Sequence, residues 1–410
     1  MAKDVIVEPD LQFTKALIAA GAGDLKKCYQ CATCGVACRI APDNSPYPRK
    51  EMIWAQWGLK DRLLNDHDVW LCHQCNDCST QCPRGANPGD VLKAVRKMNI
   101  QENSWPSFFG KLVGEPALFV LALAIPVVIV LILIALSGWG FPEGPVVKYS
   151  AHHIDPRDGF IWVRLIQVVF SLALLFAVVS VILSLRNYWN SLETKSPVEV
   201  SGYPKPFVPS LIEALSEILP HTTFKECEAN NIRYASHLMV FWGMIGLFIT
   251  TGLVFLQVDI LGEIFGMHQL MVPPSQNGPN AIPIKILGNV SAAAFVLGLG
   301  IMLVRRLTAP EETGNSAYFD WFFLFIIFGT GLTGLLTELV RWAGAVGGTY
   351  FLYSIHLMFV MALFLYLPFS KFAHLGYRTV AIAWAKSRGR NVKLATQPNY
   401  VPPAPAEPTA

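Results

Sequence analysis

Residues 28–38 read Cys-Tyr-Gln-Cys-Ala-Thr-Cys-Gly-Val-Ala-Cys, and residues 72–83 read Cys-His-Gln-Cys-Asn-Asp-Cys-Ser-Thr-Gln-Cys-Pro. Both runs space their cysteines by two, two and three residues. This spacing is typical of proteins that hold two [4Fe–4S] clusters, in which the fourth cysteine of one run ligates the cluster of the other. It predicts two crossed ligand sets. The first set is Cys28, Cys31, Cys34 and Cys82, and the second is Cys72, Cys75, Cys78 and Cys38.

Structural zinc and disulfide bonds are the alternatives for these cysteines. Zinc sites usually take Cys-x2-Cys pairs that are separated by longer gaps, so three closely spaced cysteines in each run favour clusters. Disulfides are rare on the reducing, cytoplasmic side of a membrane, where the topology below places this region. The ninth cysteine, Cys227, stands alone and is interpreted as a small buried or interfacial side chain.

The composition is that of a membrane protein. Of the 410 residues, 53% are hydrophobic and only 15% are charged, and the mean hydropathy is +0.40. The net charge of +3 is close to neutral for this length, so it does not indicate a nucleic-acid partner. Because eight of the nine cysteines precede residue 83, the metal-binding and apolar parts are expected to be separate domains.

The N-terminal domain, residues 1–105, is predicted to be helical. Apolar residues recur at helical spacing in residues 9–20, 48–64 and from residue 88 onward, on either side of the cysteine runs. The first twenty residues lack the features of a cleavable signal peptide. The sequence therefore predicts an all-α fold that begins with a helical, ferredoxin-type domain holding two [4Fe–4S] clusters.

From residue 117 onward, six segments are long and apolar enough to cross a bilayer, which needs about 20 residues. They are residues 117–137, 160–185, 234–256, 283–304, 318–340 and 350–369. The first two fall in residues 117–185 and the other four in residues 233–377, with a loop over 186–232 between them. An apolar stripe in that loop predicts a short helix, either in the membrane interface or packed on the cluster domain.

Lysine and arginine gather in the loop 186–232, at residues 305 and 306, and after residue 371. The positive-inside rule then predicts a multi-pass protein of the cytoplasmic (inner) membrane, in contact with lipid, with both termini in the cytoplasm. Residues 378–410 are predicted to be a basic and then disordered cytoplasmic tail.

Histidine within a membrane span is costly without a partner, so His237 and His356 are functional candidates, together with His374 just after the last span. Eighteen residues separate His356 from His374, which is five turns and about 27 Å of α-helix. If the helix continues through Pro368, both imidazoles lie on one face. His237 would then be level with His374, as a bis-histidine b-type haem requires. Two unrelated histidines that bond backbone carbonyls are the alternative.

A second site at His356 is less complete. The turn-matched position on the third span is Leu247, and outer-loop histidines, His268 or His152 and His153, could supply a partner. His356 could instead bond a quinone carbonyl, and the sequence leaves these interpretations open. Met244 is interpreted as a packing residue. Four polar residues could transfer quinol protons, namely Glu338, Arg341, Tyr350 and Tyr353. Because Glu338 and Arg341 lie three positions apart, an ordinary ion pair is the favoured interpretation for these two.

The run from His356 to His374, with its Leu-Pro-Phe-Ser segment, resembles the last haem-bearing helix of the gamma subunit of respiratory nitrate reductases. Ser236-His237-Leu-Met-Val-Phe-Trp-Gly resembles an earlier haem helix of that family. The resemblance implies that His237 and His374 ligate the haem nearer the clusters. The family's other histidine on that earlier helix falls at Leu247, so the resemblance leaves the number of haems, one or two, undecided.

The first hundred residues resemble the C subunit of heterodisulfide reductases, although Arg39 replaces the proline that often follows the first run. A fusion of that domain to a haem-bearing membrane domain resembles the C subunit of the quinone-interacting membrane-bound oxidoreductase complex. That resemblance implies electron exchange between menaquinone and adenylylsulfate reductase in sulfate reduction, through partner subunits that carry flavin and iron–sulfur clusters and resemble the A-type flavoprotein of heterodisulfide reductases.

The function predicted is that of an electron-transfer subunit in a quinol-dependent oxidoreductase complex, with two [4Fe–4S] clusters, haem b and a quinone substrate. The sequence has no flavin or nucleotide fingerprint and no Cys-Cys-Gly motif, so two-electron chemistry is expected in other chains. Two alternatives remain. One is a heterodisulfide-reductase-type subunit that serves another acceptor, and the other is a non-redox anchor or transporter with a structural metal domain.

Overall fold

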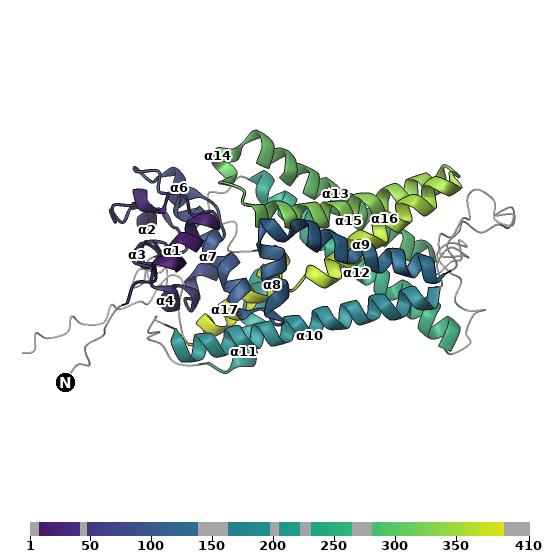
Figure 1. Ribbon diagram of the computed structural model, residues 1–410, viewed down its shortest axis with the longest axis horizontal. Coiled ribbons are helices and arrows are strands. Elements are labelled where there is room, and N and C mark those ends of the chain that lie inside the picture. Colours follow the sequence, from purple (N-terminus) through teal and green to yellow (C-terminus); the bar gives the residue numbers. More distant parts are fainter. Residues whose placement is uncertain are drawn as a thin grey trace, which may run out of the picture. The chain divides into compact units, whose positions relative to one another are not determined.

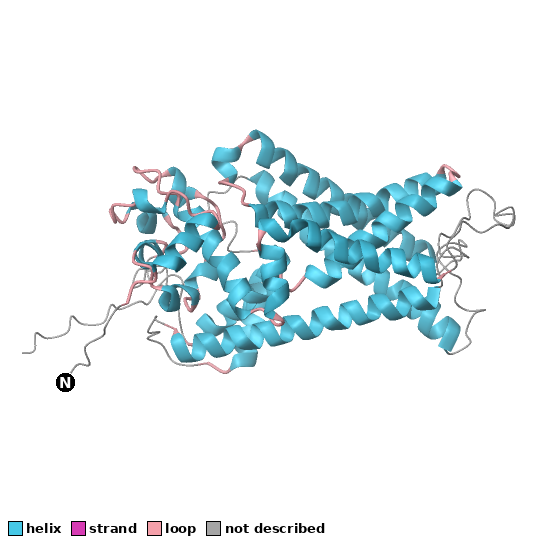
Figure 2. Cartoon of the chain, viewed as in Figure 1, coloured by secondary structure: helices cyan, strands magenta, loops and turns pink. Residues whose placement is uncertain are grey.

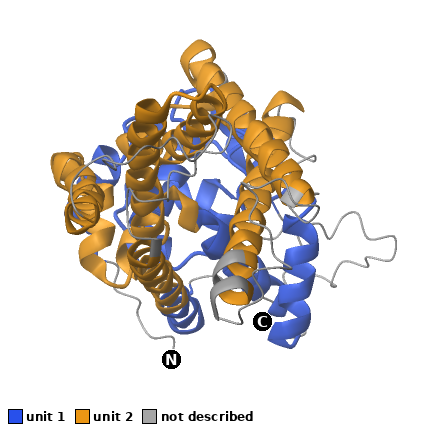
Figure 3. Cartoon of the chain, turned by 90° about the vertical axis from the view of Figure 1, so that its right-hand side faces the viewer, with its two compact units in different colours: residues 1–99, 185–229, 374–410 blue, residues 100–184, 230–373 orange. Residues whose placement is uncertain are grey.

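The computed structural model describes residues 8–41, 47–137, 163–196, 205–221, 231–264 and 281–388. In this part of the chain the secondary structure is helical, with no strand (Figures 1 and 2). The predicted all-α fold is therefore confirmed. The chain forms two compact units, coloured separately in Figure 3. The cluster unit comprises residues 1–99, 185–229 and 374–410, and the bundle unit comprises residues 100–184 and 230–373.

Short helices joined by loops build the N-terminal part of the cluster unit. They are α1 (Leu11–Ala19), α2 (Thr33–Ala37), α3 (Arg49–Gln56), α4 (Lys60–Leu64), α5 (Asp68–Leu71), α6 (Asp77–Thr80) and most of α7 (Pro88–Asn103). Helix α1 begins at Asp10, whose Oδ1 accepts a hydrogen bond from the backbone N–H of Phe13 at 2.8 Å and so caps the helix.

The segment 48–64, predicted as one helix, is two helices that are separated at Gly58. Gly58 has a φ of +66°, and a Cβ at this position would lie 2.6 Å from the carbonyl oxygen of Asp10. Only glycine accommodates both the left-handed backbone and this close approach. The break lets α1 pack beside α3 over a shared core.

The core of the cluster unit consists of apolar side chains that lie almost wholly out of solvent. They include Phe13, Leu17, Leu25, Met52, Leu63, Val91 and Val95. Five of the cysteines, Cys28, Cys38, Cys72, Cys75 and Cys82, pack against or belong to this core. The cysteine loops are therefore held on a packed helical scaffold.

Two helices distant in sequence complete the cluster unit, namely α11 (Phe207–Ile218) and α17 (His374–Ser387). Ala214 and Ile218 of α11 and Ile382 and Ala383 of α17 are buried in the same core as the N-terminal helices. Of the two predictions for α11, packing on the cluster domain is the one that the structure supports. On its other side, Val208 and Ile212 remain exposed.

The predicted tail over 378–410 is wrong up to Ser387, because those residues belong to helix α17. Tyr377, Ala381 and Trp384 of this helix are buried, so α17 is part of the folded unit. The remainder of the predicted tail, residues 389–410, lies outside the described residues, as do Cys227, His152, His153 and His268.

Among the described residues, six helices are long and apolar enough to cross a membrane, as predicted. They are α9 (Phe119–Leu136), α10 (Val163–Lys195), α12 (Asn231–Val254), α13 (Ala281–Thr308), α15 (Tyr318–Trp342) and α16 (Val346–Tyr366). Helix α8 (Ser107–Gly114) leads into α9, and a π-helical segment, Phe255–Ile264, follows α12. Apolar side chains such as Val120, Val168 and Val290 stay exposed along the spans, as contact with lipid requires.

Glycines allow close helix contacts in the bundle unit. A Cβ at Gly243 of α12 would lie 2.9 Å from backbone atoms of Ser291 and Phe295 in α13, and a Cβ at Gly331 of α15 would lie 2.7 Å from the ring of Phe295. Small residues at such crossings are how membrane helices approach one another without a hydrophobic driving force. Elsewhere, the hydroxyl of Tyr366 donates to the carbonyl oxygen of Ala122 at 2.6 Å and joins α16 to α9.

The helix that begins at Val346 ends at Tyr366 and does not continue through Pro368. Turns and a short 3-10 helix, Lys371–Ala373, separate it from α17. Proline lacks a backbone N–H and disfavours helical geometry in the residue before it, which accounts for the break. The expectation that His356 and His374 share one face of one helix is therefore wrong.

Candidate functional site

The two cysteine loops have the same backbone conformation. Gln30 and Gln74, which precede the second cysteine of each run, have φ values of 62° and 57°. Ala32 and Asn76, which follow that cysteine, have φ values of 69° and 76°. Left-handed residues on both sides of a cysteine turn the chain sharply. Helices α2 and α6 start directly after the second of these turns and pack against each other, so the two runs form a matched pair.

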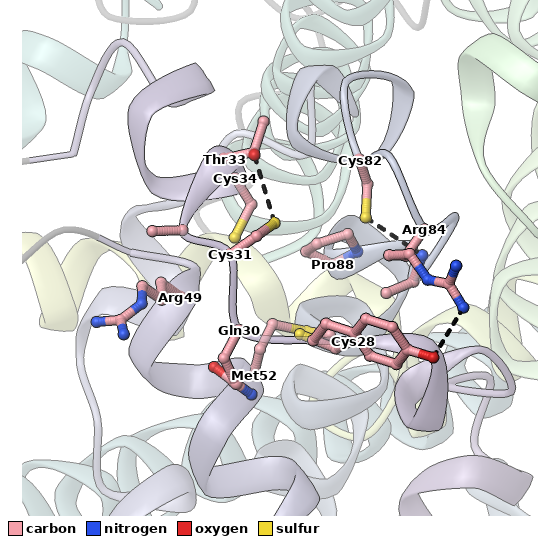
Figure 4. A pocket seen from close by; sticks show the side chains of 13 residues that line it. Cys28, Gln30, Cys31, Thr33, Cys34, Arg49, Met52, Cys82, Arg84 and Pro88 are labelled. Atoms are coloured by element: carbon pink, nitrogen blue, oxygen red, sulfur yellow. Dashed lines mark hydrogen bonds between the residues drawn. The ribbon is translucent and has the colours of Figure 1, made fainter.

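The first predicted ligand set comes together around one pocket. Cys28, Cys31, Cys34 and Cys82 all line it, and Figure 4 shows their sulfur atoms bordering the same space. The backbone N–H of Ala86 donates to Sγ of Cys82 at 3.4 Å. Burial, followed by the nearby charges of Cys28 and Cys82, raises the pKa of Cys34 to about 11. The fourth cysteine of the second run thus lies with the first three of the first run.

The second predicted set also comes together. Burial, followed by the charge of Cys72, raises the pKa of Cys38 to about 12. Burial raises the pKa of Cys78 well above its usual value, and the charges of Cys72, Cys75 and Cys38 add to the effect. The backbone N–H of Gln74 donates to Sγ of Cys72 at 3.3 Å. Cys38 therefore lies close enough to the cysteines of the second run for their charges to act on it, and ligation of a cluster by the two crossed sets stays a prediction.

The two sets differ in their exposure to solvent. Cys31 of the first set is exposed, whereas Cys72 and Cys78 of the second are buried. Arg49 and Arg84 line the first pocket, and the Arg84 guanidinium lies 4.2 Å from the centre of the Tyr29 ring, which is 69% exposed. The first set consequently faces solvent, under a rim of positive charge and aromatic surface.

The donor chemistry fits iron–sulfur clusters. The eight cysteines of the two runs are free of disulfides. Thiols crowded together in partly buried sites resist ionisation, so four thiolates can coexist in each set only beside compensating positive charge, which the irons of a cluster supply. Backbone N–H groups that donate to the sulfur atoms are a further feature of such sites.

A group of buried charged residues near the core was not predicted from the sequence. Lys50 and Glu51 fall in the segment 48–64, whose apolar spacing predicts a helix, but Glu51 is fully buried, as are Asp66, His67 and Asp68. The Nζ of Lys50 lies 2.5 to 2.8 Å from a carboxylate oxygen of each of the three acids. The run Asp66-His67-Asp68 beside an apolar stretch was the available signal.

The histidines fall in different parts of the fold. His237 lies in α12 of the bundle unit, whereas His374 is the first residue of α17 in the cluster unit. Their predicted pairing stays a prediction. Met244 is buried, as expected of a packing residue, and the predicted ion pair is confirmed by the 2.6 Å between Arg341 Nη2 and Glu338 Oε1.

His356 of α16 packs against α15. Its Nδ1 lies 3.2 Å from Oγ1 of Thr333, and that hydroxyl also lies 2.6 Å from the carbonyl oxygen of Gly329. Which of the two groups donates depends on the imidazole tautomer, and the backbone of Thr330 also forms a hydrogen bond with the ring. A Cβ at Gly334 would lie 2.9 Å from Cε1 of the imidazole, so only glycine leaves room for the ring in this position.

Comparison with known families gives two matches. Residues 24–86 match the 4Fe-4S dicluster domain, and residues 160–395 match Citrate utilization protein B. Together with the two sets of thiols and the six spans, these matches define a membrane-associated iron–sulfur protein of electron transfer. The chain belongs to the Citrate utilization protein B family, whose model covers more than half of it, and it is related to the C and E subunits of heterodisulfide reductases.

Three relatives illustrate the similarity to heterodisulfide reductase subunits. The C subunit of H(2):CoB-CoM heterodisulfide,ferredoxin reductase from Methanothermobacter marburgensis is 36% identical over 88 residues, 21% of this chain and 47% of the relative. The C2 subunit of the H(2)/formate:CoB-CoM enzyme from Methanococcus maripaludis is 30% identical over 133 residues, 32% of this chain and 70% of the relative. The E subunit of dihydromethanophenazine:CoB--CoM heterodisulfide reductase from Methanosarcina thermophila is 27% identical over 206 residues, 48% of this chain and 72% of the relative.

The two matched regions fit a fusion of a C-like part and an E-like part in one chain. The match spans about half the length of the first of these relatives. No solved structure matches the chain.

Proposed function

We propose that this chain is the membrane subunit of a quinone-linked oxidoreductase complex. It would pass electrons between quinol, haem b and two [4Fe–4S] clusters and deliver them to soluble partner subunits. One observation carries the proposal: a single chain joins two sets of four thiols to membrane-type helices that bear His237 and His356. Clusters and haem, when bound, each exchange one electron at a time, which divides the two electrons of a quinol.

The exposed first set is the proposed exit to the partner. Cys31 is exposed at the edge of its pocket, and exposed Tyr29 and Val36 lie next to the ligands in sequence. Arg49 and Arg84 give this rim a positive charge, which favours an acidic docking surface on the partner. The buried second set excludes water and suits an interior relay.

His237 and His374 are the proposed ligands of the haem nearer the clusters. Both imidazoles are half-buried, and each lies close to an end of its helix. The donor chemistry of two imidazoles suits a b-type haem. This assignment rests on the predicted topology and on the resemblance to the haem helices of nitrate reductase gamma subunits.

His356 is the proposed residue of the distal site. Hydrogen bonds with the Thr333 side chain and the Thr330 backbone orient the imidazole, and such a ring suits either a haem iron or a quinol hydroxyl. His268 remains a candidate partner from the outer loop. Whichever group binds, Thr333 holds the ring, and Gly334 leaves the space that the ring fills.

The proposed partners supply the cofactor chemistry for which this sequence has no motif. The sequence lacks a flavin fingerprint, so a flavin and iron–sulfur protein similar to the A-type flavoprotein of heterodisulfide reductases would take the electrons. Menaquinol as donor and adenylylsulfate reductase as terminal partner follow from the family resemblance alone. The basic residues around 186–205 and 305–306 favour a cytoplasmic cluster unit in the inner membrane.

The test is the haem and iron content of the purified chain, with an optical redox titration in the presence of a quinol analogue. We expect about eight irons per chain and b-haem bands that the quinol analogue reduces. The double variant His237→Ala, His374→Ala should lose haem absorbance, while the control His221→Gln should keep it. Zinc in place of iron, or no protoporphyrin, would refute the proposal.

A heterodisulfide-reductase-type subunit with another acceptor is the second candidate, which the names of the relatives favour. The absence of a Cys-Cys-Gly motif argues that this chain does not itself reduce a disulfide. Identification of the proteins that copurify with the chain separates the two candidates. A non-redox anchor or transporter predicts no haem absorbance at all.

A further inference from the structure

Two arginines from helices far apart in sequence meet at the backbone of Cys72. Arg96 of α7 donates from Nη2 to the carbonyl oxygen of Cys72 at 3.1 Å and from Nε to that of Val69 at 2.8 Å. Arg378 of α17 donates from Nη1 to the same Cys72 oxygen at 3.2 Å. Its Nη2 lies 3.4 Å from the carbonyl oxygen of Leu71.

The Arg378 guanidinium also faces the side chain that follows the ligand. Its Nη2 lies 2.9 Å from Nδ1 and 2.7 Å from Nε2 of His73. The second ligand loop is therefore contacted by Arg378 at its backbone and at His73. Charge-assisted hydrogen bonds of this kind are roughly twice as strong as neutral ones, and two of them converge on a single carbonyl.

No carboxylate among the described residues forms an ion pair with either guanidinium. Glu217, an acid whose charge acts on Arg378, pairs with Lys386 at 3.1 Å. The acids Glu51, Asp66 and Asp68 surround Lys50. Burial and then the charge of Arg96 lower the pKa of Arg378 to about 10, which still leaves it protonated at neutral pH. Neutral donors could equally form hydrogen bonds with these carbonyl oxygens. The carbonyls alone therefore do not explain why two positive charges lie side by side.

An anion next to Cys72 offsets this repulsion, and the chemistry of the second set supplies one. A cluster held by four thiolates is negatively charged, and reduction adds a further electron. Burial of Cys72 and Cys78 keeps water away and disfavours the more highly charged, reduced state. Fixed positive charge close to a ligand acts in the opposite direction.

We propose that Arg96 and Arg378 tune the buried cluster, raising the reduction potential of the iron–sulfur group held by Cys72, Cys75, Cys78 and Cys38. They are positioning residues that act through the ligand loop. The inference rests on the proposed function only in that both clusters are bound, and it needs neither haem nor quinone.

The test is an electron-spin-resonance redox titration of the complete chain with a chemical reductant. In Arg378→Gln the potential of one cluster should shift to a lower value while the other keeps its potential. Arg378→Lys retains the charge and should shift less. The control Arg388→Gln changes an arginine that directly follows the same helix and pairs with Glu193, and it should leave both potentials unchanged.

Unchanged potentials in Arg378→Gln protein with full iron content would overturn the proposal, as would equal shifts of both clusters. If Arg378→Gln protein loses the iron of one cluster, Arg96→Gln and the two lysine variants decide. The proposal is supported if Arg96→Gln lowers the reduction potential of one cluster and Arg96→Lys largely restores the wild-type value. It is refuted if Arg96→Gln and Arg96→Lys give the same potential. A missing haem spectrum would count against the proposed function and leave this titration intact.

Discussion

The ammonium of Lys50 lies 2.5 Å from a carboxylate oxygen of Asp66 in the interior of the cluster unit. Asp68 and Glu51 are 2.6 and 2.8 Å from the same nitrogen, and His67 lies 3.3 Å from Asp68. Ligand atoms of Asp66, His67 and Asp68 lie within 4.8 Å of one another, as in a metal site. Here the ammonium supplies the positive charge at the centre of the acids.

Removal of that charge should destabilise the fold. We expect Lys50→Met to lower the free energy of unfolding by about 3–5 kcal/mol, because it leaves buried carboxylates without their partner. The measurement is the denaturant midpoint of the complete chain in detergent, followed by cluster absorbance. The matched control is Lys205→Met, whose partner Glu213 is exposed and whose ion pair should contribute at most about 1 kcal/mol. Equal effects of the two variants would contradict the prediction.

The same group makes stability depend on pH. Burial, only partly offset by Lys50, raises the pKa of Glu51 well above its usual value. The folded chain therefore keeps a proton that the unfolded chain loses near pH 4. The stabilisation of the folded chain by this retained proton is complete below that pH. It is lost as the pH rises, by at most about 1.4 kcal/mol per pH unit. Asp66 has the opposite sign. Burial alone would raise its pKa, but the charges of Lys50 and His67 and the hydrogen bonds from Glu51 and Lys50 together outweigh burial and lower it to about 2.

We therefore predict that Glu51→Gln flattens the fall in stability above about pH 5, since the amide mimics the protonated acid. Below about pH 4, both proteins should still lose the contribution of Asp66 as the pH approaches 2. Denaturant midpoints across this range measure both effects. A Glu51→Gln variant with the wild-type slope above pH 5 would show that Glu51 is ionised in the folded chain.

Crossed ligation can be tested with paired cysteine variants. Cys34→Ser with Cys82→Ser removes two ligands of one cluster, so we expect about half of the iron to remain. Cys78→Ser with Cys82→Ser removes one ligand from each cluster, so most of the iron should be lost. Iron analysis and spin resonance of the two double variants make the comparison. The reverse order of iron contents would show that each run holds its own cluster.

The grouping of the cysteines and the six spans could be predicted from the sequence because both depend on local patterns. The gaps between Cys28 and Cys38 fix which sulfur atoms a loop can bring together, and hydropathy marks the six spans. The crossing of Cys38 and Cys82 was predictable because the pattern of two runs implies it. The left-handed backbone at Gln30 and Gln74 could not be predicted, because glutamine has no preference for that conformation.

What the sequence could not reveal depends on contacts between distant residues. Arg378 contacts Cys72 across 306 positions, and no local pattern distinguishes it from a tail arginine. Helix α10 continues to Lys195, past the predicted end at residue 185, because Tyr188 and Leu192 are completely buried. The helix end at Tyr366 was predictable from Pro368, but the eighteen-residue interval of the histidines favoured continuity.

The distal site yields the last prediction. The hydroxyl of Thr333 contacts Nδ1 of His356, and the backbone of Thr330 forms a second hydrogen bond with the ring. Thr333→Val keeps the shape of the side chain but removes one of these two partners, so the imidazole is held less firmly in its orientation. Loss of such an outer partner typically lowers ligand affinity or activity by about 10- to 100-fold.

We therefore expect Thr333→Val to slow cluster reduction by a quinol analogue while leaving reduction by dithionite unchanged. Thr337→Val is the matched control, because the hydroxyl of Thr337 lies one turn further along the same helix and donates to the carbonyl oxygen of Thr333 at 2.7 Å. It removes a hydroxyl that is bonded within the helix without touching the imidazole. If both variants slow quinol-driven reduction equally, the effect belongs to helix α15 in general and not to the hydrogen bond that orients His356.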